Sequence, residues 1–343
     1  MAIMNIQTAI AQVIDGSSLT TADMIAVMRQ IMTGECTDAQ IAGFLVALRM
    51  KGESVEEITG AATVMRELAT GVQVAGDHVV DIVGTGGDGI STFNISTAST
   101  FVVAAAGGQV AKHGNRSVSS KSGAADLLEA AGVRLDLSAD EVARCVAEVG
   151  VGFMFALNHH SAMKHAIGPR KELAARTIFN LLGPITNPAG APNQLLGVFS
   201  KQWVRPIAEV LRDLGSNHVL VVHSADGLDE ISVADKTFVA ELKGGQITEY
   251  EITPEQFGIE RSPLAGLKVA DAKESLVFVS KLLAGKPGPA ANIVALNAGA
   301  AIYAANLVDS LEQGIEQAKT ILASGSAAEK LTQLVQLTQL MKA

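Results

Sequence analysis

The hydrophobic pattern divides the chain into a helical beginning and a mixed remainder. Between residues 3 and 70, apolar positions recur at helical spacing and no strand pattern appears. Residues 19–33 carry one such pattern, and cap signals precede another helix at 41–50. Gly71 ends the last of these helices. The sequence therefore predicts a small N-terminal helical domain over residues 1–72.

From residue 78 onward, short apolar runs alternate with helical stretches, as expected for βαβ units around a parallel sheet. The predicted strands cover residues 79–83, 109–112, 151–156, 194–199 and 219–223. Residues 236–253 alternate apolar and polar positions around a Gly-Gly pair, which predicts an antiparallel hairpin on that sheet. The last hundred residues are mainly helical. The predicted fold class is α/β, with a larger domain over residues 73–343 around a mostly parallel central sheet.

Length and charge narrow the class of protein. A chain of 343 residues favours two domains over one core. Aromatic residues make up only 4%, so the core must be built from aliphatic side chains, which suits helices and buried parallel strands. The formal net charge of -9 would repel a phosphate backbone, so nucleic acid is not expected as a partner.

Localisation signals point to the cytoplasm. The first seven residues lack a basic region followed by an apolar run, so no signal peptide is expected. The most membrane-like stretch, residues 290–308, is mostly alanine and contains three asparagines, which predicts a buried core helix and no membrane association. Cys36 and Cys145 match no metal-ligand spacing and are expected to be free thiols in a reducing compartment.

A glycine-rich loop, Gly84-Thr85-Gly86-Gly87-Asp88-Gly89, follows the first predicted strand directly. It satisfies the dinucleotide-binding pattern, but the next helix begins too late, and Lys112 and His113 occupy the region where an acid should lie. A structural turn remains an alternative. The polar residues 94–97 at the following helix start favour an anion site, because that end offers free N–H groups.

A basic loop over residues 112–120 follows the second predicted strand. It contains two certain cations, a histidine, an amide and three serines within nine residues. Such a run is usually a solvated surface, but this one lies at a strand's carboxyl end, where α/β proteins bind ligands. Two anion-binding loops at adjacent strand ends imply a ligand with two phosphate clusters.

Such a ligand would need a divalent cation, and Asp229-Glu230 offers carboxylates on the same edge of the sheet. Hard oxygen ligands of this kind suit Mg²⁺ bridged to phosphates. A surface turn is the alternative, since Asp-Gly precedes the pair and is common in turns.

Taken in order, these strings resemble the anthranilate phosphoribosyltransferase family. The matching segments are residues 84–88, 94–97, 112–120, 122–129, 176–188 and 226–230. The resemblance spans most of the chain. It implies a nucleoside phosphorylase/phosphoribosyltransferase-like fold in which helices from about 160–190 pack on the helical domain. It also implies the substrates anthranilate and 5-phosphoribosyl 1-diphosphate, Mg²⁺ as cofactor, a role in tryptophan biosynthesis and a homodimer joined through the helical domain.

The resemblance further implies three sets of site residues. Those expected to hold the phosphoribosyl diphosphate are Gly84, Gly87, Asp88, Thr92, Asn94, Ile95, Ser96, Thr97, Lys112, His113, Gly114, Asn115, Arg116, Ser117, Val118, Ser119, Ser120 and Ala124. Those expected near anthranilate are Gly84, Asn115, Arg170, His113, His160 and Pro184. The expected metal ligands are Ser96, Asp229 and Glu230.

Arg170 has a physical reason to meet the acceptor. It lies in Gly168-Pro169-Arg170, which predicts the start of a helix, and its planar fork suits a carboxylate. Without the resemblance, an exposed helix-end arginine would be the default. For His159 and His160 a packed or surface histidine is the default, and only His160 matches a family position.

The chemistry expected of this family needs no strong base, because the aniline nitrogen is already neutral at pH 7. Catalysis is expected to come from positioning and from stabilisation of the departing diphosphate, to which Lys112 contributes, with no residue acting as acid or base. Two other functions remain open at this point. A pyrimidine nucleoside phosphorylase shares the fold, and a non-catalytic relative could use it to bind nucleic acid.

Overall fold

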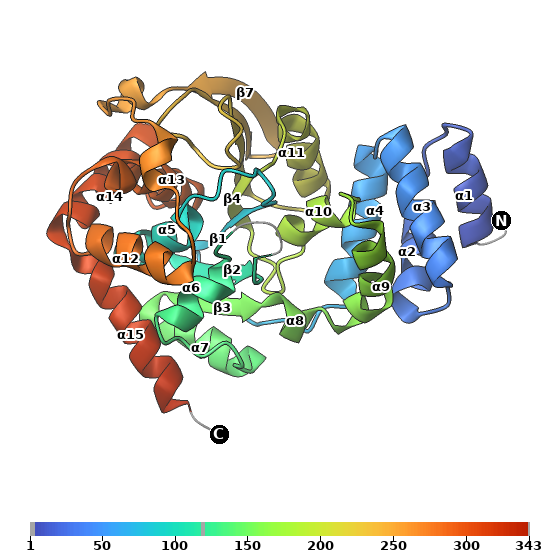
Figure 1. The fold of residues 1–343 in the computed structure, drawn as a ribbon, viewed down its shortest axis with the longest axis horizontal. Coiled ribbons are helices and arrows are strands. Elements are labelled where there is room, and N and C mark those ends of the chain that lie inside the picture. The colour runs from blue at the N-terminus through green and yellow to red at the C-terminus, as the bar shows by residue number, and fades with distance from the viewer. Residues whose placement is uncertain (1–3, 118–120, 342–343) are drawn as a thin grey trace.

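The protein, seen here as a computed structural model, has a helical unit beside a larger α/β unit (Figure 1). The structure describes residues 4–117 and 121–341. The helical unit contains α1 Ile6–Ile14, α2 Thr21–Thr33, α3 Asp38–Lys51 and α4 Val55–Glu67. Capping boxes at Thr37 and Ser54 start α3 and α4, because each side chain accepts from a backbone N–H three residues on.

The sheet of the larger unit has seven strands in the order β3-β2-β1-β4-β5-β6-β7. The strands are β1 Val79–Gly84, β2 Gln109–Gly114, β3 Val151–Phe155, β4 Asn193–Gly197, β5 His218–Ser224, β6 Thr237–Lys243 and β7 Gln246–Ile252. The first five pair in parallel, and β6 and β7 add antiparallel at one edge. The α/β class, the five parallel strands and the hairpin are therefore confirmed.

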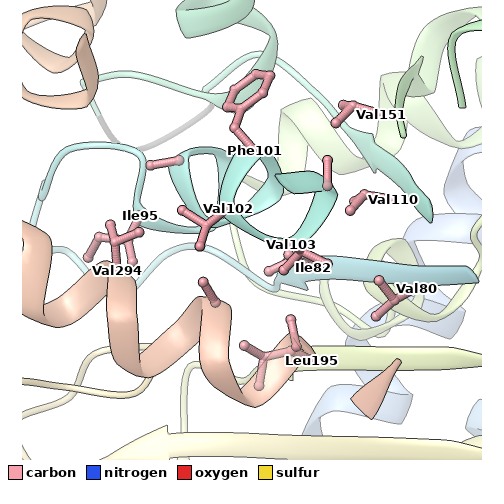
Figure 2. Packing of buried hydrophobic residues seen from close by; sticks show 14 of the residues in the cluster. Val80, Ile82, Ile95, Phe101, Val102, Val103, Val110, Val151, Leu195 and Val294 are labelled. Atoms are coloured by element: carbon pink, nitrogen blue, oxygen red, sulfur yellow. The ribbon is translucent and has the colours of Figure 1, made fainter. Parts of the chain in front are cut away.

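Helices pack on the sheet to form the main core. They are α5 Ile95–Ala105, α6 Ala124–Ala130, α7 Ala139–Val149, α12 Ala272–Leu283, α13 Pro289–Ala304, α14 Leu311–Ser324 and α15 Ser326–Leu340. Figure 2 shows side chains of α5 and α13 meeting those of the central strands. The alanine-rich segment forms α13, whose residues from Ile293 to Ala304 are all buried, as expected of a core helix. In the described part of the chain, no helix combines the length and apolar character needed to cross a membrane.

A second core joins the two units. It is built by the helical unit, by one side of β4, β5 and β6, and by the helices α9 Lys164–Leu173, α10 Phe179–Leu182 and α11 Val204–Asp213. The short helix α8 Ala156–His159 directly follows β3. In Figure 1, α10 lies between α4 and the sheet, and α9 packs against α2 and α3. Short 3-10 helices cover Ser161–Met163, Gly183–Ile185, Lys201–Trp203, Pro254–Phe257 and Leu264–Leu267.

The outer strands meet around a partly buried carboxylate, Glu241 on β6. It accepts hydrogen bonds from His218 at 3.0 Å and from the chain's only two tyrosines, Tyr303 at 2.7 Å and Tyr250 at 2.8 Å. Burial alone would raise the pKa of Glu241, but these three donors outweigh it and lower the pKa to about 2. The ionised carboxylate is thus a structural element at this edge of the sheet.

This carboxylate should make the stability of the protein depend on acid. Because its pKa is depressed in the folded state, its contribution is complete above pH 4.5 and is lost as the pH falls toward 2. The contribution is about 3 kcal/mol at neutral pH. The difference in unfolding free energy between wild type and Glu241→Gln, measured in urea, should shrink between pH 5 and pH 3. A constant difference across that range would refute the assignment.

Candidate active site

The candidate site lies where the strand order changes direction, between β1 and β4. In open α/β sheets the crevice at the carboxyl ends of such strands is the usual ligand site. Gly84 ends β1 and pairs with Gly197 at the end of β4. Asp229 lies directly over both, so that a Cβ on Gly84 would come within 2.6 Å of its Oδ2. Both strands therefore end in glycine because the carboxylate segment approaches their backbone closely.

The glycine loop after β1 is tied to the neighbouring elements. The N–H of Thr85 donates to the carbonyl of Gly197 at 2.9 Å, and the Thr85 hydroxyl accepts from the N–H of Phe199. Gly86, Gly87 and Gly89 take positive φ angles of 66°, 77° and 77°. This left-handed backbone turns successive N–H groups toward one side, as anion-binding loops do.

Asp229 and Glu230 accept hydrogen bonds from the glycine loop and from the first turn of α5. Asp229 Oδ2 accepts from the N–H of Gly86 at 2.7 Å, and Glu230 Oε1 accepts from the N–H of Ser96 at 3.0 Å. Burial, followed by the charge of Asp88, raises the pKa of Asp229 to about 6. Burial and the charge of Asp229 raise the pKa of Glu230 well above its usual value. Nearby positive charge does not offset these two effects, so a bound cation would stabilise the ionised carboxylates.

Within residues 4–117 and 121–341, no three acidic, histidine or cysteine side chains converge as a ready metal site. The pair Asp229 and Glu230 would therefore need oxygens from a ligand or water to complete a coordination shell. That arrangement is typical of Mg²⁺, which keeps several waters and bridges phosphates.

Lys112 reaches from β2 into the same strand ends and is buried. Its Nζ donates to the carbonyl of Ile82 and lies 3.4 Å from the Ser96 hydroxyl. Burial lowers the pKa of Lys112, while the charges of Asp81 and Glu230 oppose that effect. The ammonium group lies beside the N-terminus of α5, as expected of a group that meets a diphosphate.

The N-terminal turn of α5 combines free donors with structural contacts. Thr97 Oγ1 is buried and has no hydrogen-bond partner in the described part of the chain. The side chain of Asn94 instead joins three segments, because its oxygen accepts from Ser122 at 2.6 Å and from Ser275 at 2.8 Å. Thr92 forms a β-bridge with Lys268, and the Ile95 side chain is buried in the main core, so its backbone is the part available to a ligand.

Arg116, in the basic loop, does not offer a free cation. Its guanidinium pairs with Glu129 at 2.6 Å and with Asp126 at 3.2 Å on the protein surface. Asp126 also accepts from the N–H of Ser117, and the Asn115 side chain accepts from the N–H of Arg116. Gly114 lies against Ala124, the first residue of α6. Val118, Ser119 and Ser120 lie outside the described residues.

His113 is buried and is held by hydrogen bonds at both ring nitrogens. Nδ1 lies 2.8 Å from Asp81 Oδ2, and Nε2 lies 2.7 Å from the carbonyl of Gly183. In this arrangement neither nitrogen is available to a ligand. His113 can line the site with its ring face and backbone, while its polar atoms fix the surrounding structure.

The residues that the sequence predicts to lie near the acceptor are on and around α9 and α10. Arg170 lies in the last turn of α9, so the prediction that it starts a helix is wrong. The helix begins at Lys164 and continues through Gly168-Pro169, the segment that the sequence predicts to lie at a helix start. The guanidinium lies 5.0 Å from the ring centre of Phe179, and in the described residues no carboxylate is within ion-pair distance of it. A half-buried arginine without an anion is suited to bind one.

His160 and Pro184 lie beside Arg170's segment and are both buried. Burial, with smaller contributions from His113 and His159, lowers the pKa of His160 to about 4. Its Nε2 is buried without a hydrogen-bond partner in the described chain. His160 is therefore a neutral imidazole at pH 7. His159 is buried, and its Nδ1 forms a hydrogen bond with the carbonyl of Thr70 between the two units, as expected of a packed histidine.

Three residues in contact with the site have no role assigned from the sequence. Asp81 lies on β1 beneath His113, and Asn187 donates to Asp81 at 2.7 Å. Arg176 donates to the carbonyl of Gly87 and lies 4.5 Å over the ring of Phe199, so it joins the acceptor segment to the glycine loop. A charged residue inside an apolar strand was the available signal for Asp81. Arg176 and Asn187 lie in a matched segment but carry no individual signal.

Two models of one protein family match nearly the whole chain. Residues 7–69 match the family model described as glycosyl transferase family, helical bundle domain. Residues 76–328 match the model described as glycosyl transferase family, a/b domain. The class is thus a two-domain glycosyl transferase, in agreement with the helical and α/β units seen here.

Individual relatives narrow this class. The anthranilate phosphoribosyltransferase of Alkalilimnicola ehrlichii is 61% identical over 336 residues, covering 98% of this chain and 99% of the relative. That of Cellvibrio japonicus is 58% identical, covering 99% and 100%. The crystal structure of the Thermus thermophilus enzyme has a TM-score of 0.91 at 44% identity, covering 96% of this chain and 99% of that one. The chain belongs to the anthranilate phosphoribosyltransferase family.

Proposed function

We propose that this pentosyltransferase moves the phosphoribosyl group of 5-phosphoribosyl 1-diphosphate to the amine of anthranilate. The products are N-(5-phosphoribosyl)anthranilate and diphosphate, in the second step of tryptophan biosynthesis from chorismate. The family relationship supports the reaction. The observation that carries it on this chain is the guanidinium of Arg170, which pairs with no carboxylate in the described residues, together with a glycine-rich loop with left-handed backbone at the end of β1.

The phosphoribosyl diphosphate would lie along the carboxyl ends of β1 and β2. The glycine loop, the first turn of α5 and the basic loop supply N–H groups and hydroxyls there. Thr97, with its unpaired buried hydroxyl, and the Lys112 ammonium are the side chains whose positions best support this assignment. Arg116 is the weakest member of the set, because its charge is already balanced by Glu129 and Asp126.

Mg²⁺ fits the acidic pair, and Ser96, Asp229 and Glu230 would hold it. Burial, followed by neighbouring negative charge, raises the pKa of both carboxylates, and a bound cation would favour their ionised forms. A related structure from Saccharomyces cerevisiae, with a TM-score of 0.88 and 26% identity over 98% of both chains, is described as a complex with PRPP and Mg. The ion would supply positive charge to the diphosphate as it departs.

Anthranilate would lie between the glycine loop and the α9–α10 segment. Arg170 would bind its carboxylate, with Gly84, Asn115, His160, Pro184 and the ring of His113 around it. The neutral His160 and the buried Pro184 offer a surface without charge for the aromatic ring. A Saccharomyces cerevisiae relative of 25% identity, with a TM-score of 0.88, is described as a complex with 4-fluoroanthranilate.

The residues of this chain would catalyse the reaction by placing two reactants and by balancing charge. The aniline nitrogen attacks the anomeric carbon as the bond to diphosphate breaks, and its proton passes to solvent or to the released diphosphate. His113 has both nitrogens engaged, so it is not placed to accept that proton. Lys112 would stabilise the charge that develops on the leaving group.

Three broader features complete the proposal. The helical unit would comprise residues 1–72 with the helices of about 160–190, and the α/β unit the remainder. Ile14, Val46 and Met50 are exposed apolar side chains on α1 and α3, and we assign that face to a homodimer contact. The enzyme would act in the cytoplasm, without nucleic acid or membrane as a partner.

Arg170→Ala should raise the KM for anthranilate about 10- to 100-fold, because it removes a charge-assisted hydrogen-bond pair. The KM for phosphoribosyl diphosphate should change little. Arg170→Lys keeps the charge but loses the fork and should fall between. The loss of anthranilate fluorescence measures the rates, and the surface variant Arg261→Ala serves as control. Equal changes in both KM values, or none, would show that Arg170 does not bind the acceptor.

A further inference from the structure

Asp81 is a carboxylate with no solvent exposure at the centre of the sheet. Its Oδ2 lies 2.8 Å from His113 Nδ1 and accepts from Asn187 Nδ2 at 2.7 Å. Its Oδ1 faces the backbone N–H of His113 at 3.4 Å. A buried carboxylate is costly unless it is fully hydrogen-bonded, and here every donor comes from a residue bordering the candidate site.

His113 transmits this contact to a turn on the other side of the crevice. A carbonyl can only accept, so the His113 Nε2 that faces the Gly183 carbonyl carries a hydrogen. The remaining ring nitrogen and the Asp81 carboxyl share one further proton. The same Gly183 carbonyl also accepts from the Thr186 hydroxyl at 3.1 Å. The imidazole is thereby fixed at both ends, between β1 and the turn.

Asn187 fastens the other end of the same turn. Its Nδ2 donates to Asp81 and also to the carbonyl of Ala111 on β2, at 2.8 Å. The turn from Gly183 to Asn187 is therefore attached to the central strands at both ends, and Pro184 lies within it. The turn directly follows α10, whose Phe179 packs against Arg170.

We propose that Asp81 is a positioning residue for the acceptor. Through His113 and Asn187 it sets the distance between the turn at 183–187 and the strand ends that carry the donor site. The inference rests on the proposed function. The proposal adds no step to the reaction. Asp81 would touch neither substrate and would act through the residues proposed to surround anthranilate.

Asp81→Asn keeps the size of the side chain but replaces an acceptor oxygen by a donor. The bond to Asn187 or to His113 must then be lost, and the turn is released at one end. The KM for anthranilate should rise about tenfold or more, since a hydrogen bond to a charged group is disrupted. The KM for phosphoribosyl diphosphate should stay within about twofold, because the glycine loop is not attached to Asp81.

Glu241→Gln is a matched control. Glu241 is also a carboxylate bonded to a histidine in the same sheet, and the second nitrogen of His218 is likewise bonded, to Asn306 Oδ1 at 2.8 Å. It lies on β6, away from the crevice. Its loss should lower stability and leave both KM values unchanged. If the anthranilate KM rose equally in Asp81→Asn and Glu241→Gln, the cause would be general destabilisation, and the proposal would be overturned.

A double-mutant cycle with His113→Gln tests whether the two residues act together. If they do, the second substitution should add less than about threefold to the anthranilate KM of the first. Fully multiplicative effects, or an unchanged KM in Asp81→Asn, would overturn the positioning role.

Hydrogen exchange separates this inference from the proposed function. The backbone N–H groups of Gly183 and of residues 185–187 should exchange faster in Asp81→Asn and at wild-type rates in Glu241→Gln. A wild-type chain that fails to transfer phosphoribosyl to anthranilate would contradict the function, whatever the exchange shows. Unchanged exchange at 183–187 in an active Asp81→Asn enzyme would contradict the positioning role alone.

Discussion

Replacing Lys112 by methionine should lower kcat about 10²- to 10³-fold, the usual cost of removing one preorganised donor at a site of developing charge. Methionine fills similar space, and the buried ammonium is desolvated, as the lowered pKa of Lys112 indicates. Removing the ammonium leaves the buried carboxylates of Asp81 and Glu230 without its positive charge, so the melting temperature should fall as well. Turnover, measured by anthranilate fluorescence at a temperature where the variant is folded, should show the loss in kcat.

Lys330→Met is a suitable control, since Lys330 also donates from Nζ to a backbone carbonyl, that of Val149, but lies on α15. Its kcat should stay at the wild-type value. A Lys112→Met enzyme that retains turnover within about fivefold would show that this ammonium does not stabilise the departing diphosphate.

Gly197→Ala should have the largest structural effect at the site. A Cβ at this position would lie 1.5 Å from the backbone oxygen of Asp229, a distance that no side-chain adjustment can relieve. The segment carrying Asp229 and Glu230 must move, which separates the carboxylates from Gly86 and Ser96. We expect a loss of about 3 kcal/mol or more in unfolding free energy, at or above the upper end of ordinary overpacking.

The affinity for phosphoribosyl diphosphate is a second measure of the effect of Gly197→Ala. Calorimetry with phosphoribosyl diphosphate and Mg²⁺ should show at least a tenfold weaker affinity, since the loop and the acidic pair move together. Gly266→Ala, where an added Cβ meets no atom within 4 Å, should alter neither stability nor affinity. Wild-type affinity in Gly197→Ala would mean that Asp229 and Glu230 do not set the donor site.

The sequence could predict the parts of the site that are contiguous. The glycine loop follows β1 directly and leads to the first turn of α5, and Asp229-Glu230 follows β5 after a short turn. Parallel strands bring their carboxyl ends to one edge of the sheet. A local pattern is then enough to place them. The same reasoning located the antiparallel hairpin, because strand alternation and a Gly-Gly turn occur together.

Contacts between distant segments could not be predicted in this way. Arg116 looks like a free phosphate ligand in its own loop, but α6 brings Glu129 and Asp126 against it. Gly168-Pro169 resembles a helix start, yet tertiary contacts with α2 and α3 extend α9 across it. The resemblance implies that His113 contacts both substrates, but Asp81 and the Gly183 carbonyl, which are distant in sequence, occupy both of its ring nitrogens.

The central claim is tested most directly by the products. Purified protein, anthranilate, phosphoribosyl diphosphate and Mg²⁺ should yield phosphoribosylanthranilate and diphosphate in equal amounts by mass spectrometry, and omission of any component should stop the reaction. The same preparation should not phosphorolyse thymidine. Thymidine cleavage without anthranilate consumption would contradict the assignment in favour of a nucleoside phosphorylase. Binding of the diphosphate substrate without transfer would reject anthranilate as the acceptor.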